Sequence, residues 1–195
     1  MADFARRMGI AASTRVLDIG GTPECWELVE IRPQVTLLNM PRAGEGLGAR
    51  WVAGDGCALP FRDASFDVVF SNSVIEHVGD AERQQRFASE MRRVGRAYWV
   101  ETPNRWFPVE QHLLTPFVHW LPMSWQERVI PRWNLWQVLV PARPDQRRYY
   151  IEHYLRDVRL LGARDLGRLF PGAQILRERF CGWTKSLVAM GAGGA

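Results

Sequence analysis

The stretch from Val52 to Val78 constrains the fold of this chain most, because it places an acidic turn, a buried-strand pattern and a helix start at fixed spacings. It reads Val-Ala-Gly-Asp-Gly-Cys-Ala-Leu-Pro-Phe-Arg-Asp-Ala-Ser-Phe-Asp-Val-Val-Phe-Ser-Asn-Ser-Val-Ile-Glu-His-Val. Residues 66–71 are apolar on both faces, which is typical of a central parallel strand covered by helices. Asp55 would follow the preceding strand, at the edge where open α/β sheets bind ligands. With Val-Leu-Asp-Ile-Gly-Gly upstream, at 16–21, the pattern predicts a nucleoside-cofactor site.

Strand and helix patterns alternate along the chain, which is typical of an α/β protein with a parallel sheet. Strands are predicted over residues 16–19, 35–38, 51–53, 66–71, 97–101, 174–180 and 186–190. Helices are predicted over residues 4–9, 24–31, 80–94, 149–161 and 163–170. The short link between the last two strands indicates one antiparallel edge strand. We therefore expect a single domain, 1–195, folded as a Rossmann-like three-layer sandwich with a seven-stranded, mostly parallel sheet.

The composition is that of a globular protein and argues against a nucleic-acid partner. Hydrophobic residues make up 47% and charged residues 24% of the 195 residues, which is ordinary for one domain. The net charge is +4, but Lys185 is the only lysine among 25 basic residues, and the arginines are interspersed with acids. A nucleic-acid footprint would be clustered. Because no leading apolar segment and no run of about 18 apolar residues occurs, we expect a cytoplasmic protein.

The three cysteines, Cys25, Cys57 and Cys181, are an odd number without Cys-x-x-Cys spacing. Neither a disulfide framework nor a zinc site is predicted from them. A reducing compartment follows, and we expect no metal in the site.

The Leu-Pro-Phe-Arg-Asp-Ala-Ser-Phe-Asp segment at 59–67 resembles the class I S-adenosylmethionine-dependent methyltransferases, specifically the small type 11 methyltransferase-domain group. The resemblance runs from about residue 14 to 102 and resumes more faintly over 166–190. It implies S-adenosylmethionine as the cofactor. The segment between these two regions carries no general signature of that family, so the resemblance does not identify the acceptor.

The resemblance also implies which residues bind the cofactor. The family follows its first strand with an acid and Gly-x-Gly-x-Gly, and this chain keeps Asp18 and Gly20, adds Gly21, and has Thr22 and Glu24 where further glycines would stand. The glycines let the backbone approach the methionyl part of the cofactor.

The remaining cofactor contacts are expected at the ends of three further strands. Asn39, where the family has an acid, is expected to bind the ribose hydroxyls. A neutral amide forms hydrogen bonds that are weaker than those of a carboxylate by about 1 kcal/mol. Asp55 is expected to accept from the adenine amino group, and the backbone of Gly56 and Cys57 to meet the ring. Ser71, just past the fourth strand, faces the cofactor in the family.

His112, two residues after Glu110, is the best candidate for a catalytic base. A histidine can accept the proton of an acceptor hydroxyl near neutral pH, and Glu110 could orient its ring. A hydrogen-bonded loop histidine is the alternative for His112. His77, at the helix start after the fourth strand, is expected to be structural.

Five of the nine tryptophans lie between Pro103 and Pro144: Trp106, Trp120, Trp125, Trp133 and Trp136. Prolines at 108, 116, 122, 131 and 141 forbid one long helix, so short helices are expected. Three roles remain open for this Trp-rich insertion, 103–150: a cap over the acceptor, a local core, or a patch for peripheral membrane contact.

Taken together, these features predict methyl transfer from S-adenosylmethionine to an O, N or C nucleophile of a small, apolar or ring-containing acceptor. The alternative is a degenerate member of the fold that serves as a non-catalytic binding module, because Thr22, Glu24 and Asn39 depart from the family pattern. A Gly-x-Gly-x-x-Gly reductase motif is absent.

Overall fold

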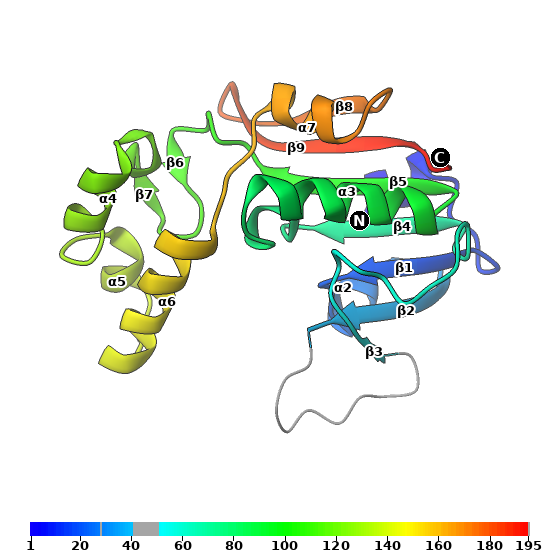
Figure 1. Cartoon of the computed structure of the whole chain (residues 1–195), viewed down its shortest axis with the longest axis horizontal. Coiled ribbons are helices and arrows are strands. Elements are labelled where there is room, and N and C mark those ends of the chain that lie inside the picture. Colours follow the sequence, from blue (N-terminus) through cyan, green and yellow to red (C-terminus); the bar gives the residue numbers. More distant parts are fainter. Residues whose placement is uncertain (28, 41–50, 195) are drawn as a thin grey trace.

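The computed structural model describes residues 1–27, 29–40 and 51–194, and a seven-stranded sheet lies at its centre (Figure 1). Its strands are ordered β3-β2-β1-β4-β5-β9-β8. Their bounds are β1 Arg15–Ile19, β2 Gln34–Asn39, β3 Trp51–Ala53, β4 Val68–Asn72, β5 Ala97–Pro103, β8 Gln174–Phe180 and β9 Trp183–Ala192. The expected seven-stranded α/β fold is confirmed.

The strands β1 to β5 run parallel, and β9 runs antiparallel to β5. The antiparallel strand therefore lies one place in from the edge, because β8 pairs beyond it as the edge strand. Ile19 at the end of β1 lies between Leu38 of β2 and Ser71 of β4. The carboxyl ends of these strands consequently meet at one edge of the sheet, where ligands bind in such folds.

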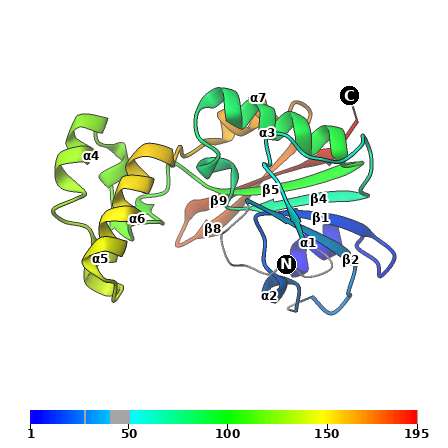
Figure 2. The same ribbon diagram turned by 60° about the horizontal axis from the view of Figure 1, so that its bottom comes forward.

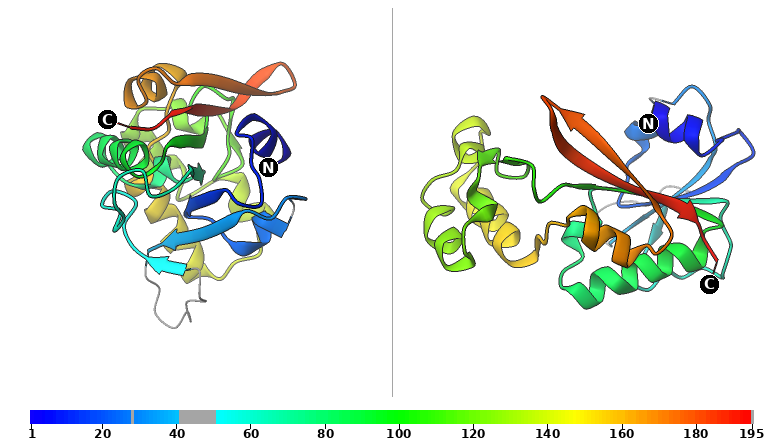
Figure 3. Two further views of the ribbon diagram at one scale, coloured as in Figure 1. Left: turned by 90° about the vertical axis from the view of Figure 1, so that its right-hand side faces the viewer. Right: turned by 90° about the horizontal axis from the view of Figure 1, so that it is seen from above.

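Helices cover both faces of the sheet, because strand residues alternate between two apolar clusters. One face packs Leu17, Val69 and Val100 under α3 (Ala81–Val94) and α7 (Ala163–Leu169). The other packs Val16, Phe70 and Trp99 under α1 (Ala2–Arg7) and α2 (Pro23–Glu27), as Figure 3 shows from two sides.

The chain leaves the sheet after β5 and builds a separate helical segment, 104–160, that projects beyond the sheet (Figure 2). Its elements are the hairpin strands β6 Val109–Glu110 and β7 Thr115–Pro116, the 3-10 helix η2 Val118–Trp120, and the helices α4 Met123–Val129, α5 Leu135–Leu139 and α6 Pro144–Asp157. A small core of its own packs Leu113, Val118, Ile130, Ile151 and Tyr154. The short helices agree with the proline spacing, whereas the hairpin was not predicted.

Two predicted helices differ from the structure by four or more residues at one or both ends. The helix predicted over 149–161 is α6, which starts five residues earlier because Pro144 occupies its first turn and ends at Asp157. The helix predicted over 24–31 is α2, which ends at Glu27. Leu28 lies outside the described residues, and the chain at 29–31 is not helical because it turns toward β2, whose first amide donates to Thr14.

Candidate active site

A pocket of about 410 Å³ lies at the carboxyl ends of β1 and β2 and in the turn after β3. Gly20, Asn39, Asp55 and Gly56 line it, as the sequence predicts. His77, Arg83 and His153, which were not assigned to the site, also line it. The pocket thus brings together residues from six separate stretches of the chain.

Two glycines form the turn at the end of β1, and each is required by a close approach. Gly20 has φ +80°, and a Cβ there would lie 2.4 Å from a methyl carbon of Val74. A Cβ on Gly21 would lie 1.8 Å from the carboxylate of Asp18. The turn therefore tolerates no side chain at either position without a shift of its neighbours.

Asp18 lies buried beneath this turn and does not line the pocket. Its Oδ2 accepts a hydrogen bond of 2.7 Å from Nε1 of Trp26. Burial raises the pKa of Asp18 to about 7, although the bond from Trp26 opposes that shift. The structure thus gives Asp18 a supporting position behind the glycine turn.

Asn39 reaches the pocket from the end of β2 and also ties the glycine turn in place. Its Nδ2 donates to the carbonyl oxygen of Gly21 at 3.0 Å. Only the amide can make this bond, because a carboxylate has no donor at neutral pH. The amide that replaces the family's acid at this position therefore has a hydrogen-bond partner in this chain.

Asp55 uses both carboxylate oxygens in the structure. Oδ1 accepts from the amide of Cys57 and Oδ2 from Nη2 of Arg83, each at 2.8 Å. Partial burial alone would raise the pKa of Asp55, but these two hydrogen bonds outweigh it and hold the pKa below its usual value. Arg83 is the neighbour that the sequence did not indicate, since it comes from α3.

Three further predicted residues lie around or behind this turn. A Cβ on Gly56 would lie 2.7 Å from the ring of Phe87, so the backbone packs directly on α3. Cys57 is buried, its thiol donates to the carbonyl of Arg83, and burial raises its pKa to about 11. Ser71 is fully buried and does not line the pocket; its hydroxyl has no partner within 1–27, 29–40 and 51–194.

His112 and Glu110 form the pair that their spacing predicts. Nδ1 of His112 donates to Oε1 of Glu110 at 2.7 Å, and Oε2 of this buried carboxylate accepts from the amide of Leu113 at 2.6 Å. Burial alone would lower the pKa of His112, but Glu110 outweighs it and raises the pKa. The ring is thus held by one edge, with Nε2 on the other.

The free edge of His112 meets His77, which lines the pocket. The two Nε2 atoms lie 3.0 Å apart. His77 stacks on His153, whose Nδ1 bonds Asp157 of α6 at 2.8 Å. Burial lowers the pKa of His77 to about 4, and the neighbouring His112 and His153 add to the shift. Three of the four histidines of the chain therefore gather at one place.

The tryptophans of the insertion do not enter this pocket. Trp106, Trp125 and Trp133 are more than half exposed. Trp106 instead lines a second hollow with Arg105, Gly162 and Arg168. A cap over the acceptor, one of the three roles left open for the insertion, stays a prediction.

The strand order of the sheet is that of the class I S-adenosylmethionine-dependent methyltransferase fold. Residues 23–97 match the Methyltransf_11 family model, which describes a methyltransferase domain. No helix of the described residues is long and apolar enough to cross a membrane.

The curated relatives that the chain matches are also named as methyltransferases. A proposed methyltransferase from Encephalitozoon cuniculi is 50% identical over 58 residues, which are 30% of this chain and 27% of that protein. The chain spans between 27% and 34% of the length of the curated relatives that it matches.

Among solved structures, the Burkholderia thailandensis 1,6-didemethyltoxoflavin-N1-methyltransferase with bound 1,6-didemethyltoxoflavin and S-adenosylhomocysteine gives a TM-score of 0.58 at 15% identity, over 100% of this chain and 76% of that one. A Rhodobacter sphaeroides protein, whose proposed identity is a Zn-dependent alcohol dehydrogenase, gives a TM-score of 0.63 at 13% identity. The match covers 97% of this chain and 86% of that one. At such identities the likeness concerns the fold alone.

Proposed function

We propose that this chain transfers a methyl group from S-adenosylmethionine to an O, N or C nucleophile of a small acceptor. The observation that carries the proposal is the pocket at the carboxyl ends of β1 and β2, which unites the glycine turn, Asn39 and Asp55. The family match over 23–97 supports the choice of cofactor.

Each predicted cofactor residue has a role in this proposal. The methionyl part lies against the backbone of Gly20 and Gly21, Asn39 bonds the ribose, and Asp55 accepts from the adenine amino group. The backbone at Gly56 and Cys57 borders the adenine ring. Asp18 supports the glycine turn from behind, and Ser71 is buried within β4.

The acceptor would enter from the side of the helical segment 104–160, where His77 and His153 line the pocket. Direct attack on the sulfonium methyl forms the new bond as the carbon–sulfur bond breaks, leaving S-adenosylhomocysteine. Alignment supplies most of what this reaction needs, since effective molarities can contribute about 7–11 kcal/mol. His112, oriented by Glu110, takes the proton of a hydroxyl acceptor through His77.

A non-catalytic binding module is the second candidate. The ion pair of Asp55 with Arg83 favours it, because the adenine-binding carboxylate already has a partner in the pocket. The departures at Thr22 and Glu24 point the same way. For either function, the three free cysteines fit the reducing conditions of the cytoplasm.

Calorimetry with S-adenosylhomocysteine tests the cofactor site. The wild type is expected to bind it and to melt at a higher temperature in its presence. Asp55→Ala should weaken binding at least about tenfold, since a hydrogen bond to a charged group contributes about 1.5–3 kcal/mol. Asp63→Ala is the matched control, because Asp63 is an exposed acid of the same segment.

A folded wild type without heat or thermal shift at millimolar ligand would contradict the proposed cofactor. Binding without turnover of any acceptor would favour the binding module. Equal affinity in Asp55→Ala and the wild type would move the adenine site elsewhere.

A further inference from the structure

We infer that Glu76, His77 and His112 bind one divalent transition-metal ion of the zinc class at the wall of the pocket. This site goes beyond the proposed function, and its test does not depend on cofactor binding or on turnover.

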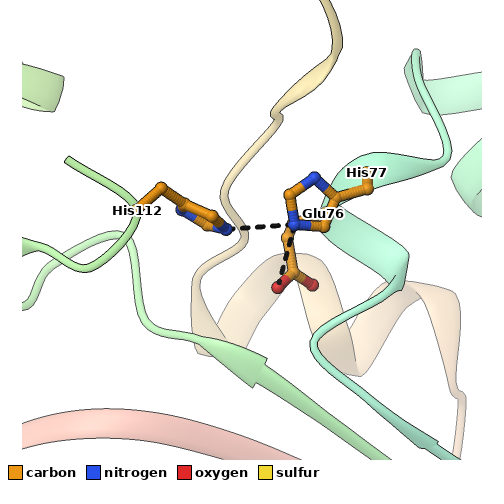
Figure 4. Close-up of side chains that lie close together, drawn as sticks. All are labelled: Glu76, His77 and His112. Atoms are coloured by element: carbon orange, nitrogen blue, oxygen red, sulfur yellow. Dashed lines mark hydrogen bonds and ion pairs between the residues drawn. The ribbon is translucent and has the colours of Figure 1, made fainter. Parts of the chain in front are cut away.

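Figure 4 shows the three side chains converging from two parts of the chain. Glu76 and His77 belong to the 3-10 helix η1 (Ile75–His77) after β4, and His112 lies in the loop between β6 and β7. Nε2 of His77 lies 3.0 Å from Nε2 of His112 and 4.0 Å from Oε1 of Glu76. One donor atom from each residue lies within 4.8 Å of the other two.

These separations suit a common ion after a small adjustment of the side chains. Zinc takes nitrogen and carboxylate ligands at about 2.0–2.2 Å, so two ligands of one ion lie at most about 4 Å apart. Two histidines and one carboxylate form a common donor set for zinc and for other divalent metals of the first transition row.

The outer contacts of His112 and Glu76 also match a metal site, whereas Nδ1 of His77 has no hydrogen-bond partner among the described residues. His112 gives Nδ1–H to Glu110, which leaves its Nε2 facing His77 and Glu76. Thr102 donates to Oε2 of Glu76 at 2.9 Å, which leaves Oε1. Metal-binding histidines almost always bond a carboxylate or carbonyl through the other ring nitrogen, and ligating carboxylates are hydrogen-bonded in turn.

A hydrogen bond between the two histidines explains only part of this arrangement. It accounts for the 3.0 Å contact, but Oε1 of Glu76 stays buried without a hydrogen-bond partner among the described residues. Among the described residues, neither Glu76 nor Glu110 forms an ion pair with an arginine or a lysine. A bound dication would give the free oxygen a ligand role and offset the charge of two buried carboxylates.

The ion would lie at the wall of the pocket. His77 lines the pocket, so an ion with three protein ligands would turn its open coordination position toward the acceptor side. A metal with such a position lowers the pKa of bound water or hydroxyl. His112 would then be a ligand and could not act as the base, so metal-free and metal-loaded protein would differ in how the acceptor loses its proton.

Titration of chelator-treated, dialysed protein with Zn²⁺ tests the site, and Co²⁺ provides a visible spectrum as a second readout. We expect one equivalent of Zn²⁺ to bind. His77→Gln, His112→Gln and the near-isosteric Glu76→Gln should each weaken Zn²⁺ binding at least about tenfold, and Thr102→Val about 10–100-fold. Each variant is first checked for native circular dichroism.

His153→Gln is the matched control, because His153 stacks on His77 with ring centroids 5.8 Å apart but belongs to a different hydrogen-bond pair. Its Zn²⁺ affinity should stay within about threefold of the wild type. Absence of stoichiometric Zn²⁺ binding by the folded wild type would overturn the inference, and so would unchanged affinity in Glu76→Gln and His112→Gln. S-adenosylhomocysteine binding by metal-free protein is measured separately, so failure of one proposal is distinguishable from failure of the other.

Discussion

At the scale of single residues, Asp18 is a carboxyl group whose burial disfavours its charged form. The glycine turn closes over its carboxyl group, so a side chain with an ordinary pKa near 4 sits where the charged form is penalised. Its pKa of about 7 means that, between about pH 4 and 7, the folded chain retains a proton that the unfolded chain has released. The contribution of Asp18 to the free energy of unfolding therefore falls as the pH rises through that window.

Asp18→Asn should remove this dependence, because an amide keeps the acceptor for Trp26 and cannot ionise. We expect the free energy of unfolding of the variant, relative to the wild type, to rise by up to about 1.4 kcal/mol per pH unit between pH 5 and 7. Urea denaturation at pH 5, 6 and 7 measures it. Asp63→Asn, at an exposed acid, should give a flat difference; a flat difference for Asp18→Asn would show that its pKa is ordinary.

At the scale of elements, Gln84 joins three parts of the chain that meet beside the site. It is buried on α3, and its Nε2 donates to the carbonyl of Ile75 in η1 and to that of Arg159, each at 3.0 Å. The amide of Arg159 in turn donates to the carbonyl of Glu76. The residue thus anchors η1, and with it Glu76 and His77, to the chain that returns from the helical segment.

Gln84→Leu should lower the free energy of unfolding by about 1–3 kcal/mol, because the buried carbonyl of Ile75 and the partly buried carbonyl of Arg159 would lose their donor. Chemical denaturation measures this change. Gln85→Leu is the control on the exposed side of the same helix and should stay within about 0.5 kcal/mol. If both variants changed stability equally, the buried amide would not be what secures η1.

At the scale of the whole molecule, two neighbouring stretches of the chain, one after β5 and one before α7, connect the helical segment 104–160 to the sheet domain (Figure 1). Asn104 and Leu161 form an isolated parallel bridge, and the amide of Arg105 donates to the carbonyl of Leu161. Since the segment also has its own apolar core, we expect it to open without unfolding the sheet. Such opening would serve a cap over the acceptor.

Ile130→Ala tests this independence, because Ile130 is fully buried in the core of the segment. Loss of a buried isoleucine costs about 2–5 kcal/mol, so hydrogen exchange should speed up across residues 113–155. Exchange in β1, β4 and β5 and the affinity for S-adenosylhomocysteine should remain near wild type. Val138→Ala, at an exposed position, is the control; equal loss of protection in the central strands would mean that sheet and segment unfold as one unit.

The sequence by itself determined the sheet and the edge of the sheet at which the pocket lies, because both depend on local patterns. Apolar runs at strand length predicted the strands, and Gly20, Asn39 and Asp55 follow strands whose carboxyl ends meet at one edge. It also predicted the pairing of His112 with Glu110, which are neighbours in the chain.

Only the tertiary structure decided which distant side chains share the site. Arg83 reaches Asp55 because α3 packs on the turn after β3, and His77 meets His112 because the hairpin β6–β7 folds back over η1. Asp18 is covered by its own glycine turn, and β9 inserts between β5 and β8. No periodicity records such contacts, since they arise from the packing of elements and not from the preferences of residues within them.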